Sequence, residues 1–392
     1  MSNRFHNNPP LRYGMVGGGV TSQIGDSHRA ALRRDSYFQL VAGAFDIDKE
    51  RGQQYGKSLG LESDRTYADY LQMAKAEVSR EDKIQVVGVM TPNSTHYPIA
   101  KTFIEAGVNV ILEKPITTNT DNALDLMRLA KEKNVLCASM YVYSGYPMVR
   151  QARAMVEAGE LGEIRVVQTE FAHGNCATAV EQNSEGAAWR NDPKKSGETF
   201  VLGDVGAHAL HLATFITRQQ VREVAADRQS FVKGRTLEDN AHVLLRFEKG
   251  AAGYLWASGL AVGHRHGLAI RVFGSKAGIE WHQERPNQLF FSPLGQTQRI
   301  LELDSPELHP PAKRLLRVGA GHPEGYFEAF SNIYSDFAEV LLAKFSGNIP
   351  DPASMDFPTL EDGAQGVRFL EACVESAENK GCWVNSKLSD SE

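Results

Sequence analysis

Five short apolar segments separated by helical patterns occupy the first third of the chain, and they constrain its fold more than any other feature. They cover residues 11–16, 39–45, 84–90, 108–112 and 135–142. Their side chains are apolar in continuous runs, which is typical of strands that are covered on both faces of a sheet. Between the runs, residues 96–106 and the segment that Thr120 is expected to cap have the apolar period of a helix. This alternation predicts an α/β domain with a doubly wound parallel sheet over residues 1–148.

The apolar pattern changes after residue 148, and residues 149–392 are predicted to form an α+β domain. Half-buried strands are expected at residues 163–171, 241–247, 253–258 and 268–273. Gly250 and Gly274 lie in short turns between neighbouring strands, which indicates hairpins and therefore an open, mainly antiparallel sheet. Residues 176–200 are polar and irregular, and residues 283–319 show little periodicity. Helices are expected at residues 148–157, 326–344 and 360–378.

The composition, with 42% hydrophobic and 23% charged residues, is that of a soluble globular protein. The net charge of −6 argues against nucleic acid or an anionic membrane as the main partner. No apolar run approaches the roughly 18 residues that cross a bilayer, and the first residues lack the apolar core of a secretory signal. The four cysteines form no C-x-x-C pair, as expected of reduced thiols. These features predict a cytoplasmic location.

A glycine-rich turn, GMVGGGVTSQIGDSH (residues 14–28), follows the first apolar run. Gly17, Gly19 and Ser22 approximate the G-x-G-x-x-G/A pattern of dinucleotide-binding sites. In that pattern the first glycine permits a tight turn, the second lets a pyrophosphate approach the backbone, and the third small residue lets helix and strand pack. Gln23 and Ile24 of the same turn are assigned to the cofactor with them.

Asp46 follows the second run and indicates which dinucleotide is bound. A carboxylate at this place can accept hydrogen bonds from both ribose hydroxyls of NAD and repels the 2′-phosphate of NADP. NAD is therefore the expected cofactor. Lys49 and Arg51 follow closely, so NADP stays open as an alternative, and Arg51 is also assigned to the cofactor site.

Polar residues also follow the third and fourth runs, where the carboxyl ends of parallel strands border the ligand crevice. Lys114, in VILEKP, is placed to reach the substrate, and Glu113 beside it is assigned to the cofactor. The preceding strand end contributes Thr91, Pro92, Asn93 and His96. Asn93 and His96 are candidates for lining the nicotinamide. The alternatives, a turn residue and a histidine in the first turn of a helix, remain equally open.

The segment LGDVGAHALHLATF (residues 202–215) places Asp204, His208 and His211 on one face of a helix. The first turn of that helix is expected to stabilise the Asp204 anion and to disfavour the imidazolium form of His208. The alternative makes Asp204 an N-cap residue and both histidines polar groups of the core. His211 is a substrate contact or a core residue.

These motifs occur in the order in which one family has them. GGGVTSQIGDSH, Asp46, TPNSTHYPIA, AGVNVILEKP and GDVGAHALHL all have counterparts there, and the combination of E-K-P with D-x-x-x-H is the most specific. The sequence resembles the glucose–fructose oxidoreductase/inositol dehydrogenase (Gfo/Idh/MocA) family from the first strand to the last helix. The resemblance implies an N-terminal Rossmann domain and a C-terminal open-sheet domain that mediates oligomerisation, as a homodimer or homotetramer. It also implies NAD(P)-dependent oxidation of a sugar or cyclic polyol such as an inositol.

By the same resemblance, the catalytic residues are Lys114, Asp204 and His208, and a His-x-Asn pair that holds a polyol falls on His173 and Asn175. The chain departs from the family in a glycine turn that is three residues longer before His28. It also has an insertion before Asp204, in which the possible substrate contacts are Trp189 and Arg190.

The expected reaction is hydride transfer to the nicotinamide with His208 as general base, Asp204 orienting it and Lys114 stabilising alkoxide character. His322 is a candidate for closing over the substrate, with a plain loop as the alternative. No metal is expected, because His264, His266 and His282 match no zinc spacing. The rival functions are an NAD-retaining lyase or glycosidase and a non-catalytic NAD- or sugar-sensing regulator.

Overall fold

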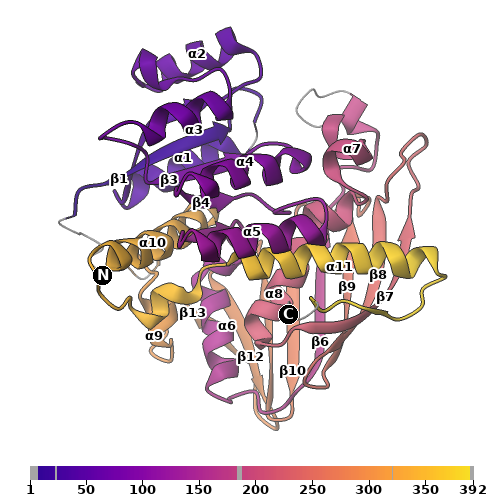
Figure 1. Ribbon diagram of the computed structural model, residues 1–392. Helices are drawn as coiled ribbons and strands as arrows, with labels where there is room; N and C mark the ends of the chain where they lie inside the picture. Colours follow the sequence, from indigo (N-terminus) through magenta and orange to yellow (C-terminus); the bar gives the residue numbers. More distant parts are fainter. Residues whose placement is uncertain (1–7, 23, 183–187, 320, 389–392) are drawn as a thin grey trace. The chain divides into compact units, whose positions relative to one another are not determined.

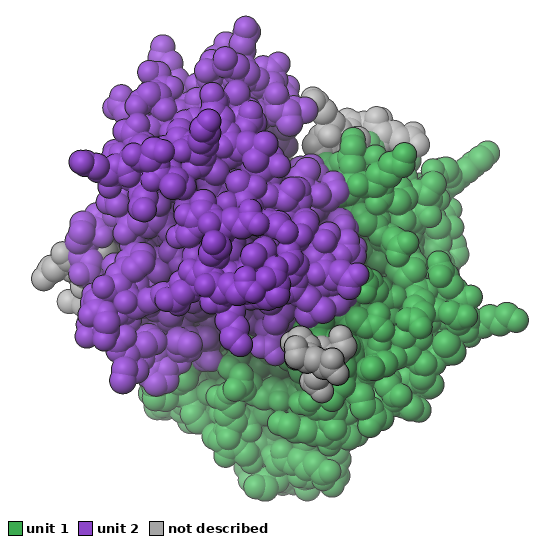
Figure 2. Space-filling view, viewed as in Figure 1, with its two compact units in different colours: residues 1–3, 141–329, 365–392 green, residues 4–140, 330–364 purple. Residues whose placement is uncertain are grey.

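The computed structural model describes residues 8–22, 24–182, 188–319 and 321–388. The chain forms two compact units, coloured separately in Figure 2. Unit 2 consists of residues 4–140 and 330–364, and unit 1 consists of residues 1–3, 141–329 and 365–392. Unit 2 therefore contains the amino-terminal α/β pattern together with a segment from near the carboxyl end of the chain.

The core of unit 2 is a five-stranded parallel sheet with the strand order β2-β1-β3-β4-β5, which confirms the predicted doubly wound sheet (Figure 1). Its strands are β1 (Leu11–Gly17), β2 (Phe38–Ala44), β3 (Val86–Met90), β4 (Asn109–Leu112) and β5 (Cys137–Ser139). β5 is shorter than predicted, because the chain passes from it into a 3-10 turn, η2 (Val142–Gly145). The order changes direction between β1 and β3, where ligands bind in sheets of this kind.

Helices connect these strands and cover the sheet. They are α1 (Gly25–Arg34), α2 (Lys49–Ser58), α3 (Tyr70–Val78), α4 (Asn93–Glu105) and α5 (Thr120–Glu132), with the 3-10 turn η1 (Ser63–Arg65). α5 is capped by Asn119, whose side chain accepts a hydrogen bond from the Asn122 N–H at 2.9 Å. The prediction that Thr120 caps this helix is therefore wrong by one residue. The later segment of unit 2 carries most of α10 (Tyr326–Phe345) and the turn η6 (Pro352–Asp356).

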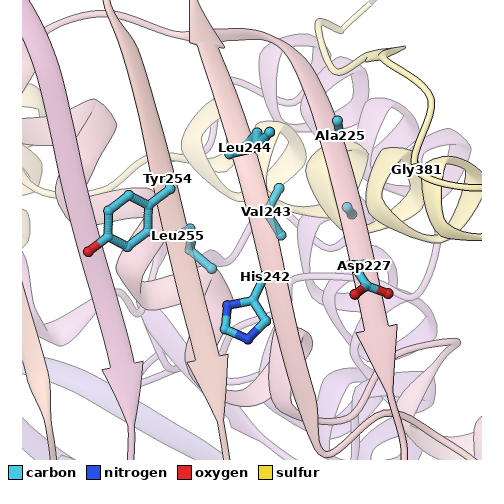
Figure 3. Close-up of a pocket in the computed structure, with 9 residues that line it drawn as sticks. Ala225, Asp227, His242, Val243, Leu244, Tyr254, Leu255 and Gly381 are labelled. Carbon is cyan, nitrogen blue, oxygen red and sulfur yellow. The ribbon is translucent and has the colours of Figure 1, made fainter.

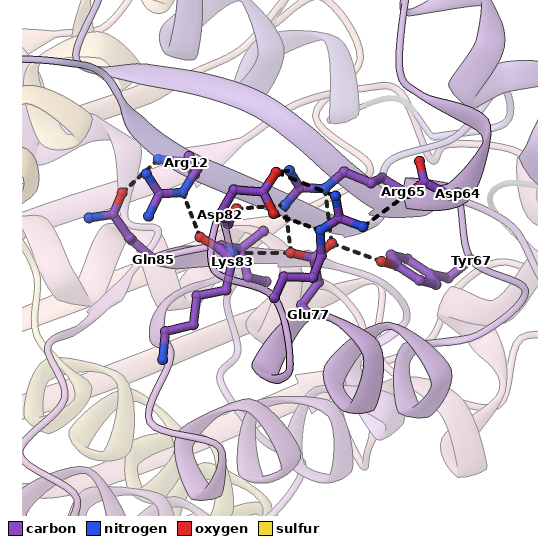
Figure 4. Close-up of polar contacts among 10 residues, drawn as sticks. Arg12, Asp64, Arg65, Tyr67, Glu77, Asp82, Lys83 and Gln85 are labelled. Atoms are coloured by element: carbon purple, nitrogen blue, oxygen red, sulfur yellow. Dashed lines mark hydrogen bonds and ion pairs between the residues drawn. The ribbon is translucent and has the colours of Figure 1, made fainter.

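A buried ion pair stabilises unit 2 away from the carboxyl ends of its strands (Figure 4). The Arg65 guanidinium donates to both carboxylate oxygens of Glu77, at 3.1 and 2.6 Å. Glu77 also accepts from the Tyr67 hydroxyl and from the Ile84 N–H, at 2.8 and 3.1 Å. Since Arg65 and Glu77 are 5% and 1% exposed, this network ties α3 to the segment that leads into β3.

Unit 1 contains a nine-stranded sheet with the order β13-β12-β11-β10-β6-β9-β8-β7-β14. Its strands are β6 (Ile164–Ala172), β7 (Val221–Gln229), β8 (Asn240–Phe247), β9 (Ala252–Ser258), β10 (Leu268–Gly274), β11 (Ala277–His282), β12 (Gln288–Pro293), β13 (Arg299–Glu302) and β14 (Val384–Asn385). Only the β6–β9 pair is parallel among these described strands, so the sheet is mainly antiparallel, as predicted. Residues 283–319, predicted to be irregular, contain β12, β13 and the short helix α9 (Pro310–Lys313).

One face of this sheet is covered by helices and the other is exposed. α6 (Pro147–Glu157) and α8 (Ala207–Thr217) pack on the covered face, together with residues of α11 (Leu360–Glu378). On β8 the side chains alternate between the two faces, with Val243 buried and Leu244 55% exposed. Among the described residues, no helix has the length and apolarity that a membrane span requires.

Candidate functional site

The carboxyl edge of the unit 2 sheet begins with a glycine turn that has room for a ligand. Gly17 ends β1 with a φ of 76°, and a Cβ atom there would lie 2.3 Å from the Met90 carbonyl oxygen. A Cβ on Gly19 would lie 2.6 Å from the carbonyl oxygen of Phe45. Only glycine fits at these two positions, and such a bare backbone is what a pyrophosphate approaches in dinucleotide sites. The turn therefore fits the cofactor that its sequence predicts.

The third small residue of the turn is Gly25, which begins α1. A Cβ on Gly25 would lie 2.4 Å from the Gly18 carbonyl oxygen, so this glycine permits the close contact of helix and turn. The packing role predicted for Ser22 is therefore wrong. The Ser22 hydroxyl instead accepts a hydrogen bond from the Gly25 N–H at 3.2 Å. Ile24 immediately precedes α1, and Gln23 lies outside the described residues.

Arg29 is a residue of this turn that the sequence reasoning missed. The residue is 4% exposed, and its guanidinium donates to the Gly18 carbonyl oxygen at 2.6 Å and pairs with Asp26. It also lies over the Tyr55 ring, 5.3 Å from the centroid. Arg29 thus stabilises the glycine turn through the Gly18 carbonyl and adds a buried positive charge beside it. Its place four residues after Gly25, on the first turns of α1, was the available signal.

Asp46 lies just beyond β2 and forms a bidentate ion pair with Arg51. The Arg51 Nε and Nη2 atoms lie 2.6 and 2.8 Å from the two carboxylate oxygens, and the Asp48 N–H donates to the same group at 3.0 Å. Burial by itself would raise the pKa of the carboxyl, but the hydrogen bonds from Arg51 and the backbone hold the pKa of Asp46 below its ordinary value. Asp46 is thus an anion at the edge where a ribose would be recognised.

The residues after β3 and β4 complete this edge. Asn93 is the first residue of α4, directly after Thr91 and Pro92, and it is 8% exposed. His96 is 1% exposed, and its ring nitrogens lie 2.7 and 2.8 Å from the carbonyl oxygens of Pro115 and Thr91. Burial lowers the pKa of His96. His96 therefore links the two turns from the first turn of α4.

Lys114 and Glu113 follow β4 at the same edge. The Lys114 N–H donates to Glu113 Oε2 at 3.2 Å, and Lys114 is half-buried. The peptide bond between Lys114 and Pro115 is cis. The carboxyl ends of β1, β2, β3 and β4 thus supply the predicted cofactor residues and Lys114 in unit 2.

In unit 1, Asp204 lies in the first turn of a π-helical segment. Residues Leu202–Gly206 form a π-helical turn, η5, that continues directly into α8. The Asp204 N–H donates to the Phe200 carbonyl oxygen at 2.9 Å. Glu238 caps the helix instead, since its Oε1 atom accepts from the N–H groups of Phe200 and Leu202 at 2.8 and 3.0 Å. Asp204 thus lies in the first turn of the helix, as predicted, whereas the alternative that made it the N-cap residue is wrong.

His208 and His211 follow on α8, within a cluster of aromatic rings. His208 is 8% exposed and meets the rings of Tyr141 and Tyr143 edge-on, with centroids 5.7 and 4.8 Å away. His211 is 4% exposed and stacks on Tyr141 at 4.3 Å with an interplanar angle of 5°. The helix continues on the amino-terminal side of His208, so no helix end acts on its charge. π-helical turns are frequent at functional sites.

His266 extends this cluster, and the sequence reasoning missed it. Its Nε2 atom lies 3.0 Å from the Tyr143 hydroxyl, and its ring centroid lies 4.6 Å from that of Phe171. Burial, and secondarily the charge of His173, lower the pKa of His266 to about 4. From the sequence, His266 is considered only as a metal ligand, because a sequence does not show which loop side chains fold inward.

The predicted His-x-Asn pair lies at the end of β6. His173 is 8% exposed, and its Nδ1 atom accepts from the Asn175 N–H at 3.2 Å, so Nε2 carries the proton in the neutral ring. Burial lowers the pKa of His173, and the charge of Asp204 partly opposes this shift. The Asn175 side chain is exposed.

The insertion before Asp204 brings Arg190 toward that carboxylate. The Arg190 Nε atom lies 3.9 Å from Asp204 Oδ2, and its guanidinium lies over the Trp189 ring at 5.2 Å. His322 is exposed in a loop, with Nδ1 3.2 Å from the Gly319 carbonyl oxygen. Glu324 is 4% exposed and accepts from the Arg317 N–H at 2.6 Å, so it closes a turn.

Histidine is the commonest metal ligand in proteins, which makes metal binding a further possible role for a cluster of histidines. Within the described part of the chain, no three His, Cys, Asp or Glu side chains are grouped so that they could hold a metal ion.

Comparisons with known proteins agree with this geometry. A model of an oxidoreductase family with an NAD-binding Rossmann fold matches residues 11–141, and a GFO/IDH/MocA C-terminal domain model matches residues 149–280. Two crystal structures of an inositol dehydrogenase homolog from Azotobacter vinelandii are similar to this chain. The complex with NAD+ is 45% identical, with a TM-score of 0.94 and coverage of 98% of this chain and 100% of that chain. The complex with NADH and myo-inositol is 44% identical, with a TM-score of 0.90 and coverage of 98% and 99%.

A curated relative is similar along its whole length as well. It is the uncharacterized oxidoreductase YfiI of Bacillus subtilis (strain 168), which is 43% identical over 382 residues. The match covers 96% of this chain and 97% of the relative.

Proposed function

This chain belongs to the Gfo/Idh/MocA family of NAD-binding oxidoreductases, and from that premise we propose that it oxidises a secondary hydroxyl of a cyclic polyol or sugar. The observation that carries the proposal is the buried imidazole of His208, four residues after the carboxylate of Asp204 on one continuous helix. Buried titratable groups beside a carboxylate are candidates for proton transfer. The inositol dehydrogenase homolog that was crystallised with myo-inositol supports an inositol as the substrate.

The bound nicotinamide supplies the hydride acceptor. His208 removes the hydroxyl proton, a task for which the ordinary imidazole pKa of about 6.5 is suited. Asp204 orients the base, and Lys114 donates a hydrogen bond to the substrate oxygen as negative charge develops on it. Oxidation then proceeds without a free alkoxide.

We assign the substrate contacts to His173, Asn175, Trp189, Arg190 and His211, with His322 closing over the site. The proton on His173 Nε2 suits a hydroxyl acceptor, and the Trp189 ring suits the C–H face of a ring-shaped substrate. Arg190, 3.9 Å from Asp204, is placed to donate to a further hydroxyl. The insertion that carries both residues then distinguishes this substrate from those of relatives without it.

An absorbance screen for NADH with inositols, aldoses, glycosides and sugar acids tests the proposal. We expect Lys114→Met to lower kcat by about a thousandfold while NAD still binds. The control is Lys133→Met, which removes an exposed lysine of the same unit. Equal turnover in the two variants would refute the assignment of Lys114. Product formed from tightly retained cofactor without net NADH would show the transient-oxidation chemistry of a lyase or glycosidase instead.

Assembly into a homodimer or homotetramer, in the cytoplasm, is part of the same proposal. The exposed face of the unit 1 sheet carries Leu244 and Tyr254, 55% and 38% exposed, around a shallow pocket between β7, β8 and β9 (Figure 3). Apolar side chains on an open sheet face are typical of an interface. Light scattering on the wild type and on Leu244→Glu tests this, and monomers in both would contradict it.

A further inference from the structure

A chain of three hydrogen bonds, buried in unit 2, ends on the carboxylate beside Lys114. The Tyr13 hydroxyl of β1 lies 2.8 Å from that of Tyr334 on α10. The Tyr334 hydroxyl lies 2.7 Å from His28 Nδ1, and His28 Nε2 lies 2.8 Å from Glu113 Oε1. Tyr13 and His28 are 0% exposed and Tyr334 is 1% exposed. The chain thus joins three elements of unit 2 to the E-K-P turn.

The protons in this chain can be assigned by counting donors. If His28 is neutral, Tyr13 donates to Tyr334, Tyr334 donates to His28 Nδ1, and His28 Nε2–H donates to Glu113, so every proton has an acceptor. A doubly protonated His28 would reverse the first two bonds. The Tyr13 proton would then have no acceptor among the described residues, in a fully buried position. Burial raises the pKa of both tyrosines, so both phenols keep their protons.

The hydrogen-bond chain does not conduct protons to solvent, because its Tyr13 end lies in the core. A Cβ atom on Gly88 of β3 would lie 1.7 Å from the Tyr13 hydroxyl oxygen, so the phenol occupies the space that this glycine leaves. Three donors in series that point at one carboxylate polarise one another in the same direction. The effect of the chain is therefore to hold Glu113.

We propose that His28 and Tyr334 are positioning residues for Lys114, acting through Glu113. The inference rests on the proposed role of Lys114 in the reaction. Glu113 receives His28 on Oε1 and the Lys114 N–H on Oε2, at 2.8 and 3.2 Å. The carboxylate is thus clamped between a buried imidazole and the backbone from which the Lys114 side chain starts. A small displacement of a catalytic group lowers the reaction rate strongly. By fixing Glu113, the hydrogen-bond chain would therefore keep Lys114 in place.

The same residues also contribute packing, which an experiment must separate from positioning. The His28 ring meets Phe330 at 5.0 Å, and the Tyr334 ring meets Phe38 at 5.5 Å. Tyr334→Phe removes the hydroxyl and keeps the ring. The matched control is Tyr37→Phe, since the Tyr37 hydroxyl donates to Glu339 of the same helix at 3.1 Å without reaching the E-K-P turn.

We expect Tyr334→Phe to lower kcat about tenfold, the usual effect of one hydrogen bond in a network, with the KM for NAD within about twofold of wild type. Tyr37→Phe is expected to keep the wild-type kcat although it also removes a hydroxyl that bonds α10. Dissociation constants for NADH, measured by fluorescence titration, should be unchanged in both variants. An equal kcat in Tyr334→Phe and Tyr37→Phe would overturn the proposal.

A second pair of variants tests the assigned protons. Glutamine at position 28 can accept from Tyr334 through Oε1 and donate to Glu113 through Nε2, whereas leucine can do neither. We therefore expect His28→Gln to keep kcat within about tenfold of wild type and His28→Leu to lose about 100-fold. Equal losses in the two variants would overturn the neutral donor chain.

The failure of this inference can be told apart from the failure of the proposed function. Wild-type turnover in Lys114→Met would remove the proposed function. An inactive Lys114→Met together with a fully active Tyr334→Phe would remove only the positioning role.

Discussion

Replacing Asp46 with serine is expected to change the preference between NAD and NADP. The carboxylate offers about four acceptor positions, and three are taken by Arg51 and the Asp48 N–H. Two ribose hydroxyls therefore require Arg51 to release at least one of its bonds. A 2′-phosphate would bring a second negative charge to the same carboxylate. Asp46→Ser removes that repulsion together with the Asp46–Arg51 ion pair, so that the Arg51 guanidinium can pair with the phosphate instead.

The size of the effect follows from the geometry. Two unit charges about 4 Å apart repel by about 4 kcal/mol at an effective dielectric constant of about 20. Arg51 lies against the carboxylate, and its side chain is 39% exposed, so solvent and its own charge screen the repulsion. Half of the unscreened value, about 2 kcal/mol, corresponds to about a 30-fold gain in affinity for the phosphorylated cofactor. NADH is expected to bind about tenfold more weakly, because one charged hydrogen-bond acceptor of the ribose is lost.

Fluorescence titration with NADH and NADPH measures both changes without a substrate. Glu50→Ser is the matched control, since Glu50 is an exposed carboxylate in the first turn of α2, near Asp46 in the chain. Adding Arg51→Ala to Asp46→Ser should reverse most of the gain for NADPH. The reasoning fails if Asp46→Ser and Glu50→Ser change the ratio of the two dissociation constants equally.

Two further predictions concern stability. Glu77→Ala leaves the Arg65 charge buried without its main partner, so it should lower the free energy of unfolding, measured by urea titration, by about 3–5 kcal/mol. The control Asp64→Ala removes an exposed carboxylate and should cost less than about 1 kcal/mol. An equally small loss in Glu77→Ala would contradict a stabilising buried ion pair. Because the pKa of His266 is about 4 in the folded protein and about 6.5 when unfolded, the unfolded chain binds its proton more strongly between these values, and stability falls as the pH drops from about 6.5 toward 4. The melting temperature of wild type should therefore fall further over this range than that of His266→Gln, and parallel curves would show that His266 titrates normally.

The local apolar pattern was sufficient to predict all five strands of the parallel sheet and four strands of the second sheet, β6, β8, β9 and β10, because burial on one or two faces gives a strand a characteristic sequence pattern. It was also sufficient to predict that Asp46 and Lys114 follow strand ends, and the carboxyl ends of parallel strands share one edge of the sheet. Gly25 was missed because the longer turn displaces the third glycine from its usual spacing.

Features that depend on contacts between residues far apart in the sequence could not be predicted from a local pattern. The start of the helix before α8 is set by Glu238, 36 residues beyond Leu202, so the local pattern left Asp204 open as an N-cap residue. The helical pattern of α10 shows an apolar face but not which sheet it covers. His266 folds inward because Phe171 and Tyr143 receive it, and neither is near it in the sequence.

Unit 2 is built from two segments that are far apart in the sequence, and this affects when it can fold during synthesis. A ribosome that has completed β5 must still add all of residues 141–329 before α10 can join the earlier strands. Until then the surfaces of Tyr13, His28 and Phe38 that Tyr334 covers stay open, in a nascent chain whose apolar surface favours aggregation. A fragment that ends at residue 148 should for the same reason be recovered mainly in inclusion bodies, and adding residues 330–364 as a separate peptide should improve its recovery.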